Sequence, residues 1–305
     1  MRHLRLPAAM FVLGTLGCAG APPAPPPQPI NAVKVVGPRL RIAVVDFENK
    51  TTYGQRLGTA SADILVTELG HTDRFILIER AKLDKIMAEQ KLGLTGAVDP
   101  NTAAQMGKLL GAAAIVTGAV SEFGVKSQGS DMLIAESKKQ VAEAVVDVRI
   151  IDAETGQILY TESGRGNATS SSSTFLGLGS SQSYDEALEG KALRAAIVGF
   201  ANNVTARLQQ IPWSCRVADL DGPTVYLDAG QRTGLKLGTV MDVVHLGGEI
   251  RSPSTGLVIG HKEARLGKIR VSNYLGEDAA TGEMIEGSAP AKGDLCKIMQ
   301  GTPGY

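Results

Sequence analysis

The segment VAEAVVDVRII, residues 141–151, alternates between two kinds of side chain along its whole length. One face carries apolar residues, namely Ala142, Ala144, Val146, Val148 and Ile150, and the other carries Glu143, Asp147 and Arg149. This period of two is typical of a strand with one buried face. The turn residues 152–156 (DAETG) follow, and QILYT (157–161) predicts the returning strand of a hairpin.

Upstream of this hairpin, β-rich runs alternate with helical patterns. Ile64, Leu65 and Leu69, for example, share one face of a predicted helix. We expect strands at 39–47, 75–79 and 113–120, helices at 60–69, 81–90 and from Asp99 to Gly111, and a final helix at 183–208. Strands that alternate with helices indicate an α/β domain, which we place at residues 38–212.

The N-terminus has the pattern of a cleaved export signal. Arg2, His3 and Arg5 precede the apolar stretch 6–16, which is too short to form a stable membrane anchor. The following TLGC (15–18) resembles a bacterial lipobox, although Thr15 stands where leucine is usual. We therefore predict that residues 1–17 are removed and that Cys18 is acylated, the alternative being an ordinary secretory signal with an incidental cysteine. The segment 18–37, which contains APPAPPPQP, would be an extended linker.

Composition changes after Ile211-Pro212, where short β-runs separated by glycine begin. These runs predict a small all-β barrel over residues 213–305: 225–227, 240–244, 258–260, 266–271 and 295–298. Cys215 and Cys296 lie near its two ends, and exported proteins fold in an oxidising compartment. We expect a disulfide between them, with two buried free thiols as the alternative.

Composition and spacing argue against several classes of function. The chain of 305 residues has 31 basic and 31 acidic side chains and no basic stripe, so nucleic-acid binding is not expected. No apolar run reaches the roughly 18 residues of a membrane-spanning helix. The four histidines are scattered, and neither metal-ligand spacing nor a nucleophile elbow occurs. We therefore expect no enzyme activity, no metal and no cofactor.

Several motifs occur in an order that resembles the CsgG family, the lipoproteins of curli-type secretion. They are LVTEL (65–69) followed by RFILIER (74–80), AAAIVTG (112–118), VRIID (148–152) with ETGQIL (154–159), and LEGKA (188–192). The resemblance implies a mixed sheet with helices on it, similar to anticodon-binding domains. It also implies anchoring to the outer membrane through Cys18, with the body facing the periplasm. The expected assembly is a homo-oligomeric ring that exports a secreted protein or helps to assemble surface polymer.

The resemblance further implies two membrane-inserting hairpins, near 122–148 and 160–186, and a pore-narrowing loop, Glu48–Leu57. Asn49 and Tyr53 are the candidate narrowing side chains. However, residues 124–131 have no continuous apolar face, and the serine-rich run 170–181 could line a polar lumen or form a flexible loop.

An alternative role is therefore a periplasmic scaffold that does not span the membrane. Such a scaffold would dock on an envelope machine, such as a cell-wall synthase or a flagellar basal structure, in the manner of LpoB or FlgT. The small barrel at 213–305 resembles the SH3-like barrel of FlgT-type factors, which suggests a docking module.

Overall fold

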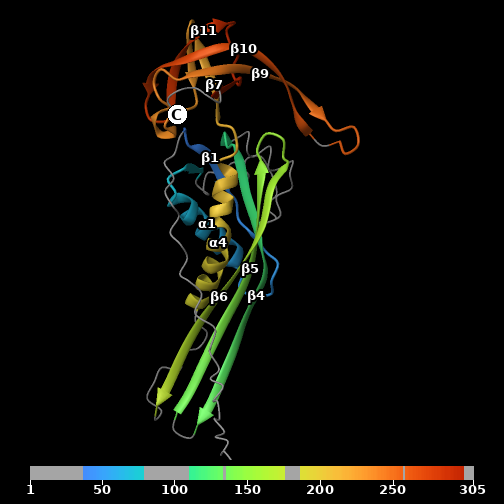
Figure 1. Ribbon diagram of the computed structural model, residues 1–305, viewed down its shortest axis with the longest axis vertical. Helices are drawn as coiled ribbons and strands as arrows, with labels where there is room; N and C mark the ends of the chain where they lie inside the picture. Colours follow the sequence, from blue (N-terminus) through green and yellow to red (C-terminus); the bar gives the residue numbers. More distant parts are fainter. Residues whose placement is uncertain (1–36, 79–109, 133–134, 176–185, 257, 299–305) are drawn as a thin grey trace, which may run out of the picture.

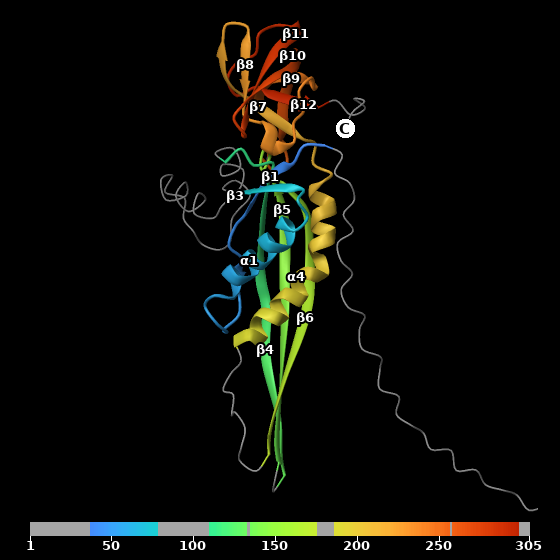
Figure 2. The ribbon, with the colours of Figure 1, turned by 90° about the vertical axis from the view of Figure 1, so that its left-hand side faces the viewer.

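The computed structural model describes residues 37–78, 110–132, 135–175, 186–256 and 258–298. A mixed α/β domain and a β-barrel lie one above the other along the longest axis of the molecule (Figures 1 and 2). The predicted signal peptide and the helix at 81–90 fall outside the described residues, as do the linker up to residue 36 and the helix from Asp99 up to residue 109.

The α/β domain contains one six-stranded sheet in the order β3-β1-β4-β5-β6, with β2 paired to β4. Its strands are β1 (Leu40–Val44), β2 (Glu48–Asn49), β3 (Phe75–Ile78), β4 (Ala114–Met132), β5 (Ala135–Asp152) and β6 (Ile158–Phe175). β1 runs parallel to β3 and β4, whereas β4, β5 and β6 are antiparallel. The sheet is therefore mixed, as predicted.

Two helices, α1 (Leu57–Gly70) and α4 (Glu186–Leu208), cover one face of this sheet (Figure 2). The apolar row predicted at 142–150 is buried beneath them, with every member at most 2% exposed. It joins Leu65, Leu193, Ile197 and Phe200 in the main core. The period of two in this segment thus identified the buried face correctly.

Glycines on β6 let α4 approach the sheet closely. A Cβ atom at Gly166 would overlap backbone atoms of Ala192 and Ala196, and one at Gly164 would overlap the Ala196 carbonyl. Small residues therefore face each other on the helix and the strand, and any larger side chain would push them apart.

Strands β4 and β6 run much farther than the apolar runs 113–120 and 157–161 indicate by themselves, and they extend into the regions where the family resemblance implied hairpins. The expected strands ended near residues 120 and 161, whereas β4 reaches Met132 and β6 reaches Phe175. The interpretation of the serine-rich run from 170 as a flexible loop is wrong up to Phe175, because these residues pair with β5. The paired run consists of serine and threonine up to Thr174, so no hydrophobic pattern marks it.

The strands between residues 214 and 298 form a closed barrel in the order β10-β11-β8-β7-β12-β9. Its strands are β7 (Ser214–Asp221), β8 (Thr224–Leu227), β9 (Val240–Arg251), β10 (Val258–Leu275), β11 (Ala279–Gly287) and β12 (Leu295–Ile298), with a 3-10 turn at Gln231–Thr233. The core is small and apolar, with Val217, Leu227, Met241 and Ile269 each at most 1% exposed.

Candidate functional site

The most prominent surface feature is a three-stranded arm that extends from the α/β domain (Figures 1 and 2). It consists of the ends of β4 and β6 and the beginning of β5, and it continues in register past the tips of α1 and α4. Lys126 pairs with Val141 and Val141 with Thr169, and the next rows are Ser127-Gln140-Ser170 and Gln128-Lys139-Ser171. The predicted hairpin at 122–148 is therefore a hairpin in the structure.

Both faces of the arm carry polar residues. Neighbouring rows of a sheet lie on opposite faces, so Lys126 and Thr169 mark one face and Gln140 and Ser170 mark the other. Lys126, Gln128, Lys139 and Thr169 are exposed. A strand that contacts lipid needs a continuous apolar face, and these rows do not provide one.

The arm has two open edges. β6 is the last strand of the sheet and pairs only with β5 among the described strands, so its outer edge is open from Ile158 to Phe175. On the other side, the pairing of β4 with β1 and β2 ends at Val120, so within the described part of the chain residues 122–132 pair with β5 alone. Open edges expose unpaired N–H and C=O groups and favour pairing with another chain.

The second predicted hairpin, at 160–186, is only partly described. Residues up to 175 belong to β6, residues 176–185 lie outside the described residues, and α4 begins at Glu186. Among the described residues, no helix has both the length and the apolar character needed to cross a membrane.

The loop after β2 is held by Asn49. The Asn49 amide donates hydrogen bonds to the carbonyls of Tyr53 and Gly54 at 2.9 and 2.8 Å, and its oxygen accepts from the backbone and hydroxyl of Thr51. Asn49 therefore closes the loop on itself. Its predicted role in narrowing a pore stays a prediction.

Tyr53, the other narrowing candidate, lies on the sheet. Its ring packs edge-on against Phe123 of β4, with ring centroids 5.4 Å apart, and its side chain is 40% exposed. A Cβ atom at Gly54 would lie 3.8 Å from both carboxylate oxygens of Glu189 on α4. Burial there raises the pKa of Glu189 above its ordinary value. The loop is thus seated between β4 and α4.

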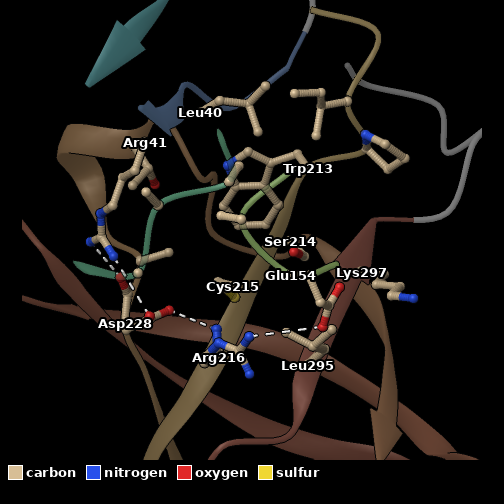
Figure 3. Close-up of a pocket in the computed structure, with 18 of the residues that line it drawn as sticks. Leu40, Arg41, Glu154, Trp213, Ser214, Cys215, Arg216, Asp228, Leu295 and Lys297 are labelled. Atoms are coloured by element: carbon tan, nitrogen blue, oxygen red, sulfur yellow. Dashed lines mark hydrogen bonds and ion pairs between the residues drawn. The ribbon is translucent and has the colours of Figure 1, made fainter. Parts of the chain in front are cut away.

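A cavity of about 310 Å³ lies between the α/β domain and the barrel (Figure 3). Arg41, Glu154, Trp213, Arg216 and Asp228 line it, and the indole of Trp213 donates to the Arg39 carbonyl at 3.1 Å. The Arg216 backbone N–H donates to the Asp228 carboxylate at 2.6 Å, and the Arg216 guanidinium lies 3.9 Å from Glu154.

The basic side chains that line this cavity all have acidic partners. Arg41 pairs with Asp228 and Arg216 with Glu154, while Arg39 and Lys297 pair outward with Asp73 and Glu263. The Arg41–Asp228 and Arg216–Glu154 pairs connect the two domains, and the four pairs together leave little attraction for an ionic ligand. The cavity is therefore a junction between domains.

The predicted disulfide between Cys215 and Cys296 is not formed. The two residues are direct partners across β7 and β12, and both are free, buried thiols. A hydrogen bond to Cys296, followed by burial, raises the pKa of Cys215 well above its ordinary value. Because the thiolate is the form that reacts, a buried thiol with a raised pKa is protected from oxidation.

The described residues contain no group of three or more His, Cys, Asp or Glu side chains that could hold a metal. The predicted lipidation site, Cys18, lies outside the described residues. Sequence reasoning did not find the pair His245 and Asp294, whose Nδ1 and Oδ1 atoms lie 2.7 Å apart. They come from β9 and the turn before β12, 49 positions apart, and no local motif connects them.

Comparison with known proteins supports the resemblance found in the sequence. Residues 30–221 match the family described as "Curli production assembly/transport component CsgG". A protein of Neisseria meningitidis serogroup B, whose name describes it as a lipoprotein (NMB1126/NMB1164), is 31% identical over 188 residues, which cover 58% of this chain and 80% of that protein.

Two solved structures show weaker similarity. Lipoprotein GNA1162 from Neisseria meningitidis is 18% identical with a TM-score of 0.33, and the match covers 56% of this chain and 97% of that one. The LpoB C-terminal domain from Salmonella enterica is 13% identical with a TM-score of 0.30, covering 43% of this chain and 85% of that one. Both TM-scores are low.

Proposed function

The chain belongs to the CsgG family, and we propose that it is an exported lipoprotein whose copies assemble into a ring. In this proposal, acylated Cys18 anchors the protein to the outer membrane, and the α/β domain and the barrel face the periplasm. The ring serves the export or assembly of a surface polymer.

The observation that carries the proposal is the pair of open edges on the arm. The free edge of β4 (residues 122–132) and the free edge of β6 (Ile158–Phe175) lie on opposite sides of the same antiparallel ribbon. One copy can therefore offer its β4 edge to the β6 edge of the next. Such a head-to-tail contact repeats around an axis and closes into a ring when the rotation permits.

Cysteine cross-linking tests this contact. Lys126→Cys is combined in turn with Thr161→Cys, Arg165→Cys or Thr169→Cys, which sample the register along β6. Positions 126 and 169 are separated by β5, so their Cα atoms lie about 9–10 Å apart in one chain, too far for an internal disulfide. Oxidation of membranes should give a ladder of multimers for one of these pairs.

The matched control combines Lys126→Cys with Asn202→Cys, an exposed position on α4, and should give no ladder. If none of the three β6 positions cross-links while the protein remains in the membrane fraction, contact between the open edges is excluded.

A second candidate function is a scaffold that does not span the membrane and docks on an envelope machine. The polar rows on both faces of the arm favour it, because neither face suits lipid. The barrel, with its predicted SH3-like, FlgT-type character, would then be the docking module. The proposed partner is a secreted substrate for the export ring and an envelope machine for the scaffold.

Two measurements separate the candidates. A membrane-crossing ring conducts ions in planar bilayers, whereas a scaffold does not. A Cys18→Ala variant of a scaffold is soluble and monodisperse. An export ring whose arms enter lipid would instead aggregate without detergent.

A further inference from the structure

Strands β9 and β10 continue beyond the barrel as a two-stranded ribbon. β9 pairs with β12 only from Met241 to Val244, and β10 pairs with β11 only from Gly267 to Leu275. Among the described strands, residues 245–251 therefore pair only with β10, and residues 258–266 pair only with β9. Figure 1 shows this ribbon reaching sideways from the barrel. We call it the barrel ribbon.

Among the described residues, no third strand pairs with the barrel ribbon. An isolated two-stranded hairpin is only marginally stable in water unless a further strand or a packed surface supports it. Ile250 and Ile259 are 42% and 52% exposed, although β-branched apolar residues stabilise strands mainly by packing.

Except for the exposed Lys262, the charged side chains of the barrel ribbon are paired within the chain. Arg251 lies against Glu249, Lys297 contacts Glu263 at 2.6 Å, and Arg265 contacts Asp242 at 2.7 Å. Its isoleucines are therefore the groups that a partner would cover.

The barrel ribbon also lies next to the start of β6. The Gln157 amide donates to the Val258 carbonyl at 3.2 Å, and Gln157 immediately precedes that strand. The first residues of β6, Ile158 and Leu159, are 49% and 46% exposed. Ile250 and Ile259 of the barrel ribbon and Ile158 and Leu159 of β6 are thus exposed apolar residues on two segments that this hydrogen bond joins. We call these four residues the ribbon patch.

We propose that the ribbon patch packs against a second copy of this chain, namely the neighbour that meets the β6 edge. This inference rests on the proposed ring and adds a second contact to it, on the barrel side of the arm. Ile158 and Leu159 belong to β6 itself, so a neighbour seated along the β6 edge also reaches the patch. Apolar burial here would strengthen the ring, since the polar arm offers mainly backbone hydrogen bonds.

The contact is made by side chains and not by strand addition. Register shifts interrupt the barrel ribbon between Val258 and Gly260, between His261 and Glu263, and between Arg265 and Gly267. Bulges of this kind twist an edge strand and discourage edge pairing. The isoleucine side chains are therefore the part of the barrel ribbon that meets the neighbour.

A double variant tests the proposal in the full-length acylated protein. Ile250→Ser with Ile259→Ser should raise the protein concentration at which detergent-extracted rings dissociate by on the order of tenfold or more. Particle mass is measured by mass photometry during dilution. The control is Leu237→Ser with Leu275→Ser, two barrel side chains 49% and 56% exposed and outside the barrel ribbon, which should leave the dissociation unchanged.

A photoreactive amino acid in place of Ile259 gives a second measurement that does not depend on a destabilised variant. Irradiation of membranes should give a product of twice the chain mass containing only this protein, and the same label in place of Leu237 should not. The inference is overturned if the rings dissociate identically in wild type and variant, or if a label at position 259 captures no second copy. Either result leaves the proposed ring itself standing. Absence of rings in the wild type overturns the ring itself.

Discussion

Arg41 of β1 and Asp228, which follows β8, join the two domains directly. The Arg41 guanidinium donates to the Asp228 carbonyl at 2.6 Å and lies 3.6 Å from its carboxylate. Both side chains are less than one-third exposed. This pair, together with the Trp213 indole bound to the Arg39 carbonyl, fixes how the barrel sits on the sheet.

Arg41→Met should therefore destabilise the protein and weaken the coupling of the domains. The loss of a half-buried, charge-assisted hydrogen bond predicts a decrease of about 1.5–3 kcal/mol in the free energy of unfolding, measured in urea. Arg39→Met is the matched control, because the Arg39–Asp73 ion pair is exposed and should contribute about 0–1 kcal/mol. Equal effects of the two substitutions would refute the role of Arg41.

The two barrel cysteines should behave as protected thiols. In the Cys18→Ala variant without reductant, iodoacetamide should label no thiol in the native protein and two after denaturation, because Cys215 and Cys296 are free and buried. Mass spectrometry counts the labels. A denatured protein that takes up none would show that the two cysteines are disulfide-bonded.

The stability of the fold should decrease when even a single methyl group is added at Gly166. Gly166→Ala places a methyl group against the backbone of α4 at Ala192 and Ala196 and should cost about 1–3 kcal/mol of stability. Gly124→Ala on β4 meets no atom within 4 Å and should be neutral or slightly stabilising. Thermal unfolding followed by circular dichroism compares the two, and a neutral Gly166→Ala would contradict the close packing.

The stability of the α/β domain should depend on the ionisation of Glu189. Burial raises the pKa of Glu189 above its ordinary value of 4.5, so the folded state favours the protonated carboxyl. Stability from this group is present below pH 4.5 and decreases as the pH rises through the folded pKa.

Glu189→Gln removes this dependence. The variant should gain stability relative to the wild type as the pH rises from 4 to 7, measured by urea unfolding at each pH. Parallel stability curves for the two proteins would show that Glu189 is not desolvated in the fold.

The sequence predicted the parts of the fold in which burial imposes a pattern. The row from Ala142 to Ile150, the helix ending at Leu208 and the strand at Phe75–Ile78 all have one face in a core, so their apolar spacing is visible. The order of the motifs also identified the family correctly.

The arm could not be predicted in the same way. Lys126, Gln128, Lys139 and Thr169 are exposed, so no buried face sets an apolar pattern there, and the pairing depends on the backbone hydrogen bonds between the strands. The domain junction was also missed, because Arg41 and Asp228 are 187 positions apart and meet only in the folded chain. The disulfide prediction was wrong for a different reason. Cys215 and Cys296 are neighbours in the barrel, as expected, but both are buried free thiols, and burial protects a thiol from oxidation.

The most direct test of the central proposal is the particle formed by the mature, acylated protein after gentle detergent extraction. Negative-stain electron microscopy with mass photometry gives both its shape and its copy number. We predict closed rings with a single, uniform number of copies. Monomers at the same concentration would contradict assembly through the open edges of β4 and β6.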